Sequence, residues 1–146
     1  MAEPVLPTIP DDVLLEILTV FHTVAVGGLS ANPDRDSHRV AKYLQEHGYR
    51  IVPVNPAEKE VLGEKSYADL ADIPVAVDVV DVFRRPEAAP EIVDAAIRVG
   101  AKAVWLQLGI RHDEAAAKAR EAGLDVVQDR CMKVEHARLI RAPRER

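Results

Sequence analysis

The sequence has little that would crosslink a small protein or anchor it in a membrane. It holds a single cysteine, Cys131, which excludes an intrachain disulfide framework and fits a reducing compartment. No apolar run reaches the roughly 18 residues that a transmembrane helix needs. Basic residues number 19 against 24 acidic ones, and the net charge of -5 argues against general nucleic-acid binding. These absences predict a cytoplasmic protein without nucleic acid or membrane as a partner.

Aromatic residues are also scarce, at 4% of the chain, while apolar residues together make up 48%. The core must therefore consist mainly of valine, leucine, isoleucine and alanine. Such a core is typical of parallel strands that are covered by helices on both faces. The length of 146 residues predicts one domain over 1–146, with an extended proline-rich arm at 1–10 and a polar tail at 141–146.

Short apolar segments alternate with amphipathic segments, several of which stop at a glycine. Strands are predicted at 23–26, 49–54, 77–83, 103–108 and 124–128. Helices are predicted at 11–21, 37–47, 87–99, 113–122 and 132–139, with a helical turn at 67–71 inside a longer connection. This alternation predicts an α/β fold, a Rossmann-like, doubly wound and mainly parallel five-stranded sheet flanked by helices. A mixed α+β sheet is the alternative.

In such a sheet, ligands bind beyond the carboxyl ends of the strands. The first of these loops opens with Gly27 and Gly28, which let the backbone approach a ligand closely. Ser37 stands where a helix cap is expected, Arg35 and Arg39 add positive charge, and a helix amino end favours an anion. The loop therefore suits a pyrophosphate, although it lacks the G-x-G-x-x-G pattern. The alternative is a plain strand-to-helix turn.

The next two loops bear on which cofactor is bound. NAD sites usually place an acid after the second strand, but here Val54, Asn55 and Pro56 follow it, which counts against NAD. Lys59 is either a partner for a ribose phosphate or a solvated lysine. After the third strand, Phe83 either lies against an adenine or fills the core. Arg84 and Arg85 either neutralise phosphate or contact the neighbours of the following helix.

The remaining loops hold one further glycine and the cysteine. Gly109, two residues after Gln107, allows another close backbone approach. Cys131, between two basic residues, is either a nucleophile paired with His136 or a buried thiol beside a surface histidine. The histidines show no metal-ligand spacing, and no carboxylate pair or other catalytic constellation is identified. The residues themselves thus favour a binding protein that is not an enzyme.

The segments VAVGGLSANPDRDSHRVAKYLQEHGYRIVPVNP, EVLGEKSYADL, DVVDVFRRPE, AKAVWLQLGI and QDRCMKVEHARL resemble, in the same order, the small stand-alone coenzyme A-binding proteins of bacteria and archaea. That family in turn resembles the coenzyme A (CoA)-binding domain of the succinyl-CoA synthetase alpha subunit. The resemblance covers about residues 10–140. It implies that CoA lies across the carboxyl ends of the strands.

The resemblance also implies where each part of CoA is bound. The first loop would hold the phosphates, Val54, Asn55 and Pro56 would border the adenosine with the Phe83 loop, and Gln107 to Ile110 would follow the pantetheine arm. The candidate cofactor-binding residues are Gly28, Leu29, Ser30, Arg35, Ser37, His38, Arg39, Val54, Asn55, Pro56, Lys59, Phe83, Arg84, Arg85, Gln107 and Gly109.

Two departures qualify the resemblance. The synthetase alpha subunit carries its phosphorylated histidine in a second domain that has no counterpart here, so synthetase chemistry is not implied. Gly27 stands where relatives often have valine or another small residue, a change that we expect to be tolerated. The leading hypothesis is a protein that binds CoA or acyl-CoA without catalysis of its own. The alternatives are an NAD(P)-dependent oxidoreductase and thiol exchange between Cys131 and CoA; protein partners and oligomeric state stay open.

Overall fold

The computed structural model describes residues 9–141, so most of the predicted arm and nearly all of the predicted tail lie outside the described residues. The strands are β1 Thr23–Gly27, β2 Arg50–Val54, β3 Glu60–Val61, β4 Glu64–Lys65, β5 Val79–Val82, β6 Ala103–Leu106 and β7 Asp125–Val127. The helices are α1 Asp11–Val20, α2 Asp36–Glu46, α3 Ala89–Val99, α4 Asp113–Glu121 and α5 Met132–His136. Three short turns complete them: η1 Leu70–Asp72, η2 Pro86–Ala88 and the π-type turn η3 Ala137–Arg141.

Five of the strands form one parallel sheet in the order β2-β1-β5-β6-β7. This confirms the predicted Rossmann-like fold. The chain first places β2 on one side of β1 and then crosses over to place β5 on the other side. Gly27 pairs with both Val54 and Val82, so these three strands end at the same level. The switch point, where ligands bind in open α/β sheets, therefore lies at the end of β1.

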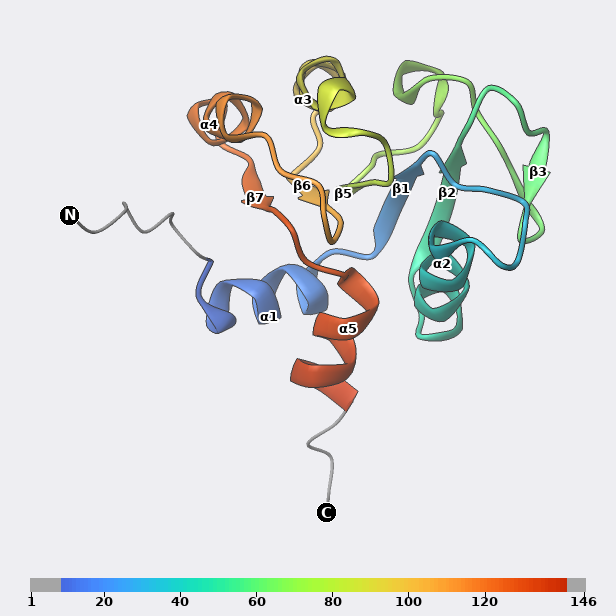
Figure 1. Cartoon of the computed structure of the whole chain (residues 1–146), viewed down its shortest axis with the longest axis horizontal. Helices are drawn as coiled ribbons and strands as arrows, with labels where there is room; N and C mark the ends of the chain where they lie inside the picture. Colours follow the sequence, from blue (N-terminus) through green and yellow to red (C-terminus); the bar gives the residue numbers. More distant parts are fainter. Residues whose placement is uncertain (1–8, 142–146) are drawn as a thin grey trace.

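Alternate side chains of each strand build two separate cores, one on each face of the sheet. Val24 and Val26 of β1 belong to the core under α1, α2 and α5, while Ala25 belongs to the core under α3 and α4. Figure 1 shows α3 and α4 on one side of the strands and α1 and α5 on the other. Trp105 is fully buried in the first core, and its indole N–H donates to the carbonyl of Arg130 at 2.8 Å.

The sequence prediction differs from the structure mainly in the connection after β2. A small antiparallel hairpin of β3 and β4 lies there, turning at Leu62 and Gly63, which both have positive φ. The predicted strand at 103–108 ends earlier, at Leu106, because the chain then turns and the amide of Ile110 donates to the carbonyl of Gln107 at 2.8 Å. That turn places Gln107 at the edge of the sheet.

Candidate ligand-binding site at the switch point

The chain leaves β1 through Gly28, at a point where only glycine fits. Its φ is +82°, and a Cβ atom there would lie 2.8 Å from the carbonyl oxygen of Phe83. The amide of Gly28 donates to the carbonyl of Val54, and the amide of Phe83 donates to that of Gly27, both at 2.9 Å. These bonds join the ends of three strands and bring the backbone after Gly28 over the switch point.

Several predicted ligand residues serve to hold this first loop in place. The side chain of Leu29 is buried, and its carbonyl accepts from the Asn55 amide group at 2.9 Å. The amide of Ser30 donates to the Ser37 hydroxyl at 3.0 Å, and the His38 Nδ1 lies 2.9 Å from the Ser30 carbonyl. Ser37 is thus not the helix cap that the sequence predicted. The helix begins one residue earlier, and the Ser37 hydroxyl reaches back to the loop instead.

The amino end of α2 carries the two arginines that the sequence placed there. Arg35 occupies the N-cap position and is exposed. Arg39 forms an ion pair with Asp36 and also donates to the carbonyl of Asp34 at 2.6 Å. Its side chain is 53% exposed, so an anion from solvent can reach it. The helix dipole favours an anion at this end of α2, where Asp36 balances the charge of Arg39.

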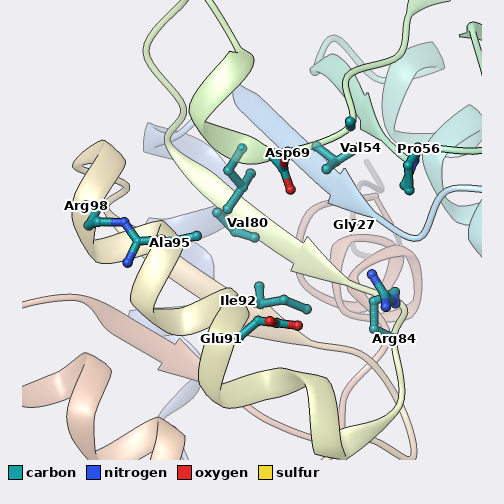
Figure 2. A pocket seen from close by; sticks show the side chains of 12 residues that line it. Gly27, Val54, Pro56, Asp69, Val80, Arg84, Glu91, Ile92, Ala95 and Arg98 are labelled. Atoms are coloured by element: carbon teal, nitrogen blue, oxygen red, sulfur yellow. The ribbon is translucent and has the colours of Figure 1, made fainter.

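On the α3 face of the sheet lies a cavity of about 250 Å³, which we call the β2–α3 cavity. Val54, Pro56 and Ile92 supply part of its apolar wall. Figure 2 shows Arg84 and Arg98 at opposite ends of it, with Asp69 and Glu91 also on its wall. Its lining residues are Gly27, Val54, Pro56, Ala68, Asp69, Leu70, Val80, Arg84, Glu91, Ile92, Ala95 and Arg98.

On the opposite face lies a second cavity, of about 360 Å³, which we call the α2–α5 cavity. Its lining residues are Asp36, Arg39, Val40, Phe83, Gln107, Leu108, Ile110, Cys131, Lys133 and Val134. Phe83, expected beside the adenosine, is half-buried and faces this cavity instead of the β2–α3 cavity. Because Gly27 and Phe83 are joined by a backbone hydrogen bond, the two cavities lie on either side of the same strand ends.

A buried polar pair lies next to the α2–α5 cavity. Asp81, in the middle of β5, is fully buried, and its Oδ1 accepts from Nε2 of Gln107 at 2.6 Å. Its Oδ2 has no hydrogen-bond partner within residues 9–141. Burial raises the pKa of the Asp81 carboxyl to about 7, against the opposing effect of the Gln107 hydrogen bond. The sequence analysis missed Asp81, although an acid inside the apolar run VVDV was a signal that could have found it.

Other predicted site residues lie outside both cavities. The amide group of Asn55 binds the Leu29 carbonyl with Nδ2 and accepts from the Ala57 amide with Oδ1. Lys59 lies exposed just before β3. Gly109 is exposed in the turn after β6, and its amide donates to the Asp129 carboxylate at 2.7 Å. Asn55 and Gly109 thus shape loops in this structure.

The paired arginines after β5 both lie exposed at its carboxyl end. Arg84 lines the β2–α3 cavity, and it also borders a surface hollow of about 290 Å³ with Arg85. Among the residues that the sequence predictions missed are four from α3, namely Glu91, Ile92, Ala95 and Arg98. Nothing in an amphipathic helix pattern distinguishes the side chains that border a cavity from those that pack on the sheet.

Cys131 and His136 have different surroundings. Cys131 is half-buried and lines the α2–α5 cavity, so it is not the buried thiol of the simpler interpretation. His136, expected at the surface, is only 5% exposed. Its Nδ1 lies 2.9 Å from the Tyr43 hydroxyl, and its ring packs edge-on against His47. The helix therefore directs His136 into the core under α2 and leaves Cys131 at the cavity.

These features define a class of protein: a Rossmann-like α/β domain with candidate ligand cavities on both faces of its switch point. Residues 22–137 match the model of a protein family described as a CoA binding domain, and the chain belongs to that family. This bears out the resemblance seen in the sequence. Of the described residues, no helix is long and apolar enough to cross a membrane.

Known relatives agree with this assignment. "Uncharacterized protein YneT" of Bacillus subtilis is 43% identical over 122 residues, which cover 84% of this chain and 90% of that protein. The alpha subunit of an ADP-forming acetate–CoA ligase II of Pyrococcus furiosus is 41% identical over 56 residues, which cover 38% of this chain and 12% of the subunit. The structure of a hypothetical protein from Pyrococcus horikoshii OT3 superimposes with a TM-score of 0.89 at 46% identity, covering 95% of this chain and 99% of that one.

Proposed function

We propose that this protein binds CoA or an acyl-CoA across the carboxyl edge of its sheet, as a cytoplasmic binding module without catalysis of its own. The observation that carries the proposal is the pair of cavities on opposite faces of the switch point, with the Gly28 backbone between them. CoA has a matching division into a phosphorylated nucleotide, a pyrophosphate and a long flexible arm. Membership of the CoA-binding domain family supports this ligand over NAD(P).

The nucleotide end fits the β2–α3 cavity. Val54, Pro56 and Ile92 offer an apolar surface for an adenine ring. Arg84, at the mouth beside Gly28, is exposed and suits the 3′-phosphate, because a guanidinium group can bind phosphate through two parallel hydrogen bonds. Asp69 and Glu91 lie on the same wall and can accept hydrogen bonds from ribose hydroxyls or the adenine amino group.

The pyrophosphate fits between the two cavities, over the loop that follows Gly28. This position faces the amino end of α2, where backbone amides and the helix dipole favour an anion. Arg39 lies there, and its present partner is the carboxylate of Asp36. On binding, Arg39 would share its guanidinium group with the phosphate. The pantetheine arm would then run past Phe83 into the α2–α5 cavity.

The direct test is isothermal titration of the stripped protein with CoA, with NAD and NADP as comparison ligands. Arg84→Ala and Arg39→Ala should each weaken CoA binding by about tenfold, the usual loss for a hydrogen bond to a charged group. Arg120→Ala is the matched control, because Arg120 is exposed on α4 and lines neither cavity. Saturable binding of NADP without any response to CoA would overturn the proposal.

A second candidate function is thiol exchange at Cys131, favoured by the position of this residue on the wall of the α2–α5 cavity. The Cys131 thiolate would attack one sulfur of a CoA disulfide, forming a protein–CoA disulfide and releasing the other half as a thiolate. Incubation with oxidised CoA followed by intact-mass measurement should show one added CoA, absent in Cys131→Ser. An unmodified mass, under conditions that modify a control thiol, would exclude the exchange.

A further inference from the structure

The α2–α5 cavity is coupled to a buried carboxyl group through a single side chain. Asp81 and Phe83 project from the same face of the sheet, because Val26 and Trp105, the strand partners of Asp81, belong to the core against which Phe83 packs. Phe83 and Gln107 both line the cavity, and Gln107 bonds Asp81 at 2.6 Å. Asp81 itself is completely buried, with its Oδ2 unpartnered among the described residues. Gln107 is therefore the link between the carboxyl group and the cavity.

Gln107 has one donor end and one acceptor end, and Asp81 determines which of them turns away. An ionised carboxylate only accepts hydrogen bonds, so it holds the amide N–H of Gln107, as the structure has it. The carbonyl oxygen of Gln107 is then the atom offered elsewhere. A protonated Asp81 carboxyl can instead donate to the Gln107 carbonyl oxygen. The side-chain amide of Gln107 would then be rotated by half a turn and would offer its N–H group to the cavity.

We propose that Asp81 and Gln107 form a proton-linked recognition pair for the arm of CoA, in which the protonation state of Asp81 sets whether Gln107 accepts or donates a hydrogen bond toward the ligand. This inference rests on the proposed function. The arm carries amide N–H groups, a hydroxyl and a terminal S–H group, which donate hydrogen bonds, and amide carbonyls, which accept them. Because Asp81 engages Nε2 of Gln107 in the structure and leaves its carbonyl oxygen for the cavity, we assign a donor of the arm to this oxygen, and the ionised form of Asp81 is then the one that binds the arm best.

Within residues 9–141, Asp81 has no charged partner that would mask this effect. On the neighbouring strands it pairs with Val26 and Trp105, and α1 packs apolar side chains into the same core. The titratable and charged groups that line the cavity or enter this core from α2, the residue before β2, and α5 with its N-cap are Asp36, Arg39, Tyr43, Tyr49, Cys131, Lys133, Glu135 and His136. Arg39 pairs with Asp36, Glu135 pairs with Arg130 and Arg138, and His136 bonds Tyr43. Burial accounts for the raised pKa of Asp81, about 7, with no charged group contributing.

The direction in which CoA affinity changes with pH follows from the form of Asp81 that the ligand prefers. Since the ligand favours ionised Asp81, binding lowers the pKa of this carboxyl and releases a proton below about pH 7. CoA binding therefore tightens as the pH rises through neutrality. One linked proton changes the affinity by at most about tenfold per pH unit. The 3′-phosphate of CoA titrates in a similar range, so the effect must be measured against a variant that lacks only the carboxyl.

The test is titration of CoA at pH 6 and pH 8 into the wild-type protein and Asp81→Asn, which keeps the shape but does not ionise. We expect the affinity of the wild type to rise between the two pH values by about tenfold more than that of the variant. We also expect a larger proton release for the wild type, measured from binding enthalpies in buffers of different ionisation enthalpy. As a control ligand, 3′,5′-ADP lacks the arm and should give the same pH profile for both proteins.

The outcomes separate this inference from the proposed function. The recognition pair would be overturned, with CoA binding left intact, if the wild type and Asp81→Asn had equal pH profiles for CoA. It would also be overturned if the two proteins differed as much in their pH profiles for 3′,5′-ADP as for CoA. Failure of the wild type to bind CoA at either pH would overturn the proposed function and this inference with it. If Asp81→Asn does not fold, carbon-13 NMR titration of the Asp81 carboxyl in the wild type decides the matter. Its pKa should fall when CoA is added, and an unchanged pKa would overturn the inference.

Discussion

Gly27 and Gly28 are neighbours in the sequence but meet different requirements. At Gly27 a Cβ atom would meet only the carbonyl oxygen of Asp81, at 3.9 Å, which is an ordinary van der Waals contact. At Gly28 it would lie 2.8 Å from the carbonyl oxygen of Phe83, on a backbone with φ of +82°. Only the second position needs glycine, and a small side chain fits at the first.

Replacing Gly28 with alanine should therefore destabilise the protein by about 2 kcal/mol or more, from left-handed strain and the clash with a backbone that is fixed in the sheet. Gly27→Ala, the matched control, should change the free energy of unfolding by no more than about 0.5 kcal/mol. Urea denaturation monitored by circular dichroism gives both values. Equal losses for the two variants would contradict the role assigned to Gly28.

Asp81 shows at the same scale why a local motif is an incomplete guide to a site. The predicted site residues lie mainly in the loops beyond the strands, where ligands of this fold bind. Asp81 lies within β5 and was not among the predicted site residues. Its carboxyl group nevertheless bears on the cavity, because it is hydrogen-bonded to Gln107, which lines the cavity wall. That relation depends on the pairing of β5 with β6, which no single residue specifies.

At the scale of elements, the first and last helical segments are tied together by charge. The Arg138 guanidinium in η3 donates to both carboxylate oxygens of Asp11 at the start of α1, at 2.9 and 3.0 Å. It also bonds Glu135, which is mostly buried. Arg138 lowers the pKa of Asp11, chiefly by this hydrogen bonding. The tie joins two elements that cover the same face of the sheet.

Asp11→Asn should therefore lower the urea midpoint at pH 7, because the ionised carboxylate is the form that Arg138 stabilises. A depressed pKa contributes stability above the ordinary value of 3.8, and that contribution is lost as the pH falls through the folded-state pKa. The difference from the wild type should shrink toward about pH 3. Asp72→Asn, at an exposed acid in η1, is the control; an equal effect at both pH values would contradict the ion-pair explanation.

Helix α3 contributes side chains to the β2–α3 cavity that the sequence did not predict. Its amphipathic pattern predicted a helix that covers the sheet, and the structure confirms the helix. However, Glu91, Ile92, Ala95 and Arg98 also form one wall of the β2–α3 cavity. The same pattern of residues would result if α3 lay flush on the strands. Asp69 and Leu70, which precede α3 in the sequence, also line this cavity.

At the scale of the whole molecule, the strand order creates the candidate site. Because the chain crosses from β2 to β5 on opposite sides of β1, the loops after these strands diverge from one point. One cavity opens toward α3 and the other toward α2 and α5. A ligand with two dissimilar ends and a charged middle suits that geometry. This division of the molecule underlies both the proposed CoA site and the recognition pair beside it.

The sequence by itself determined the alternation of strands and helices, the parallel sheet and the loops that approach the switch point, because apolar periodicity and glycine punctuation are local properties. It also carried the family resemblance. Only the tertiary structure decided that Ser37 and Asn55 hold loops, that Phe83 faces the α2–α5 cavity, and that Gln107 is hydrogen-bonded to Asp81. These outcomes depend on strand register and crossover packing, which bring together residues that are distant along the chain and leave no pattern in the sequence.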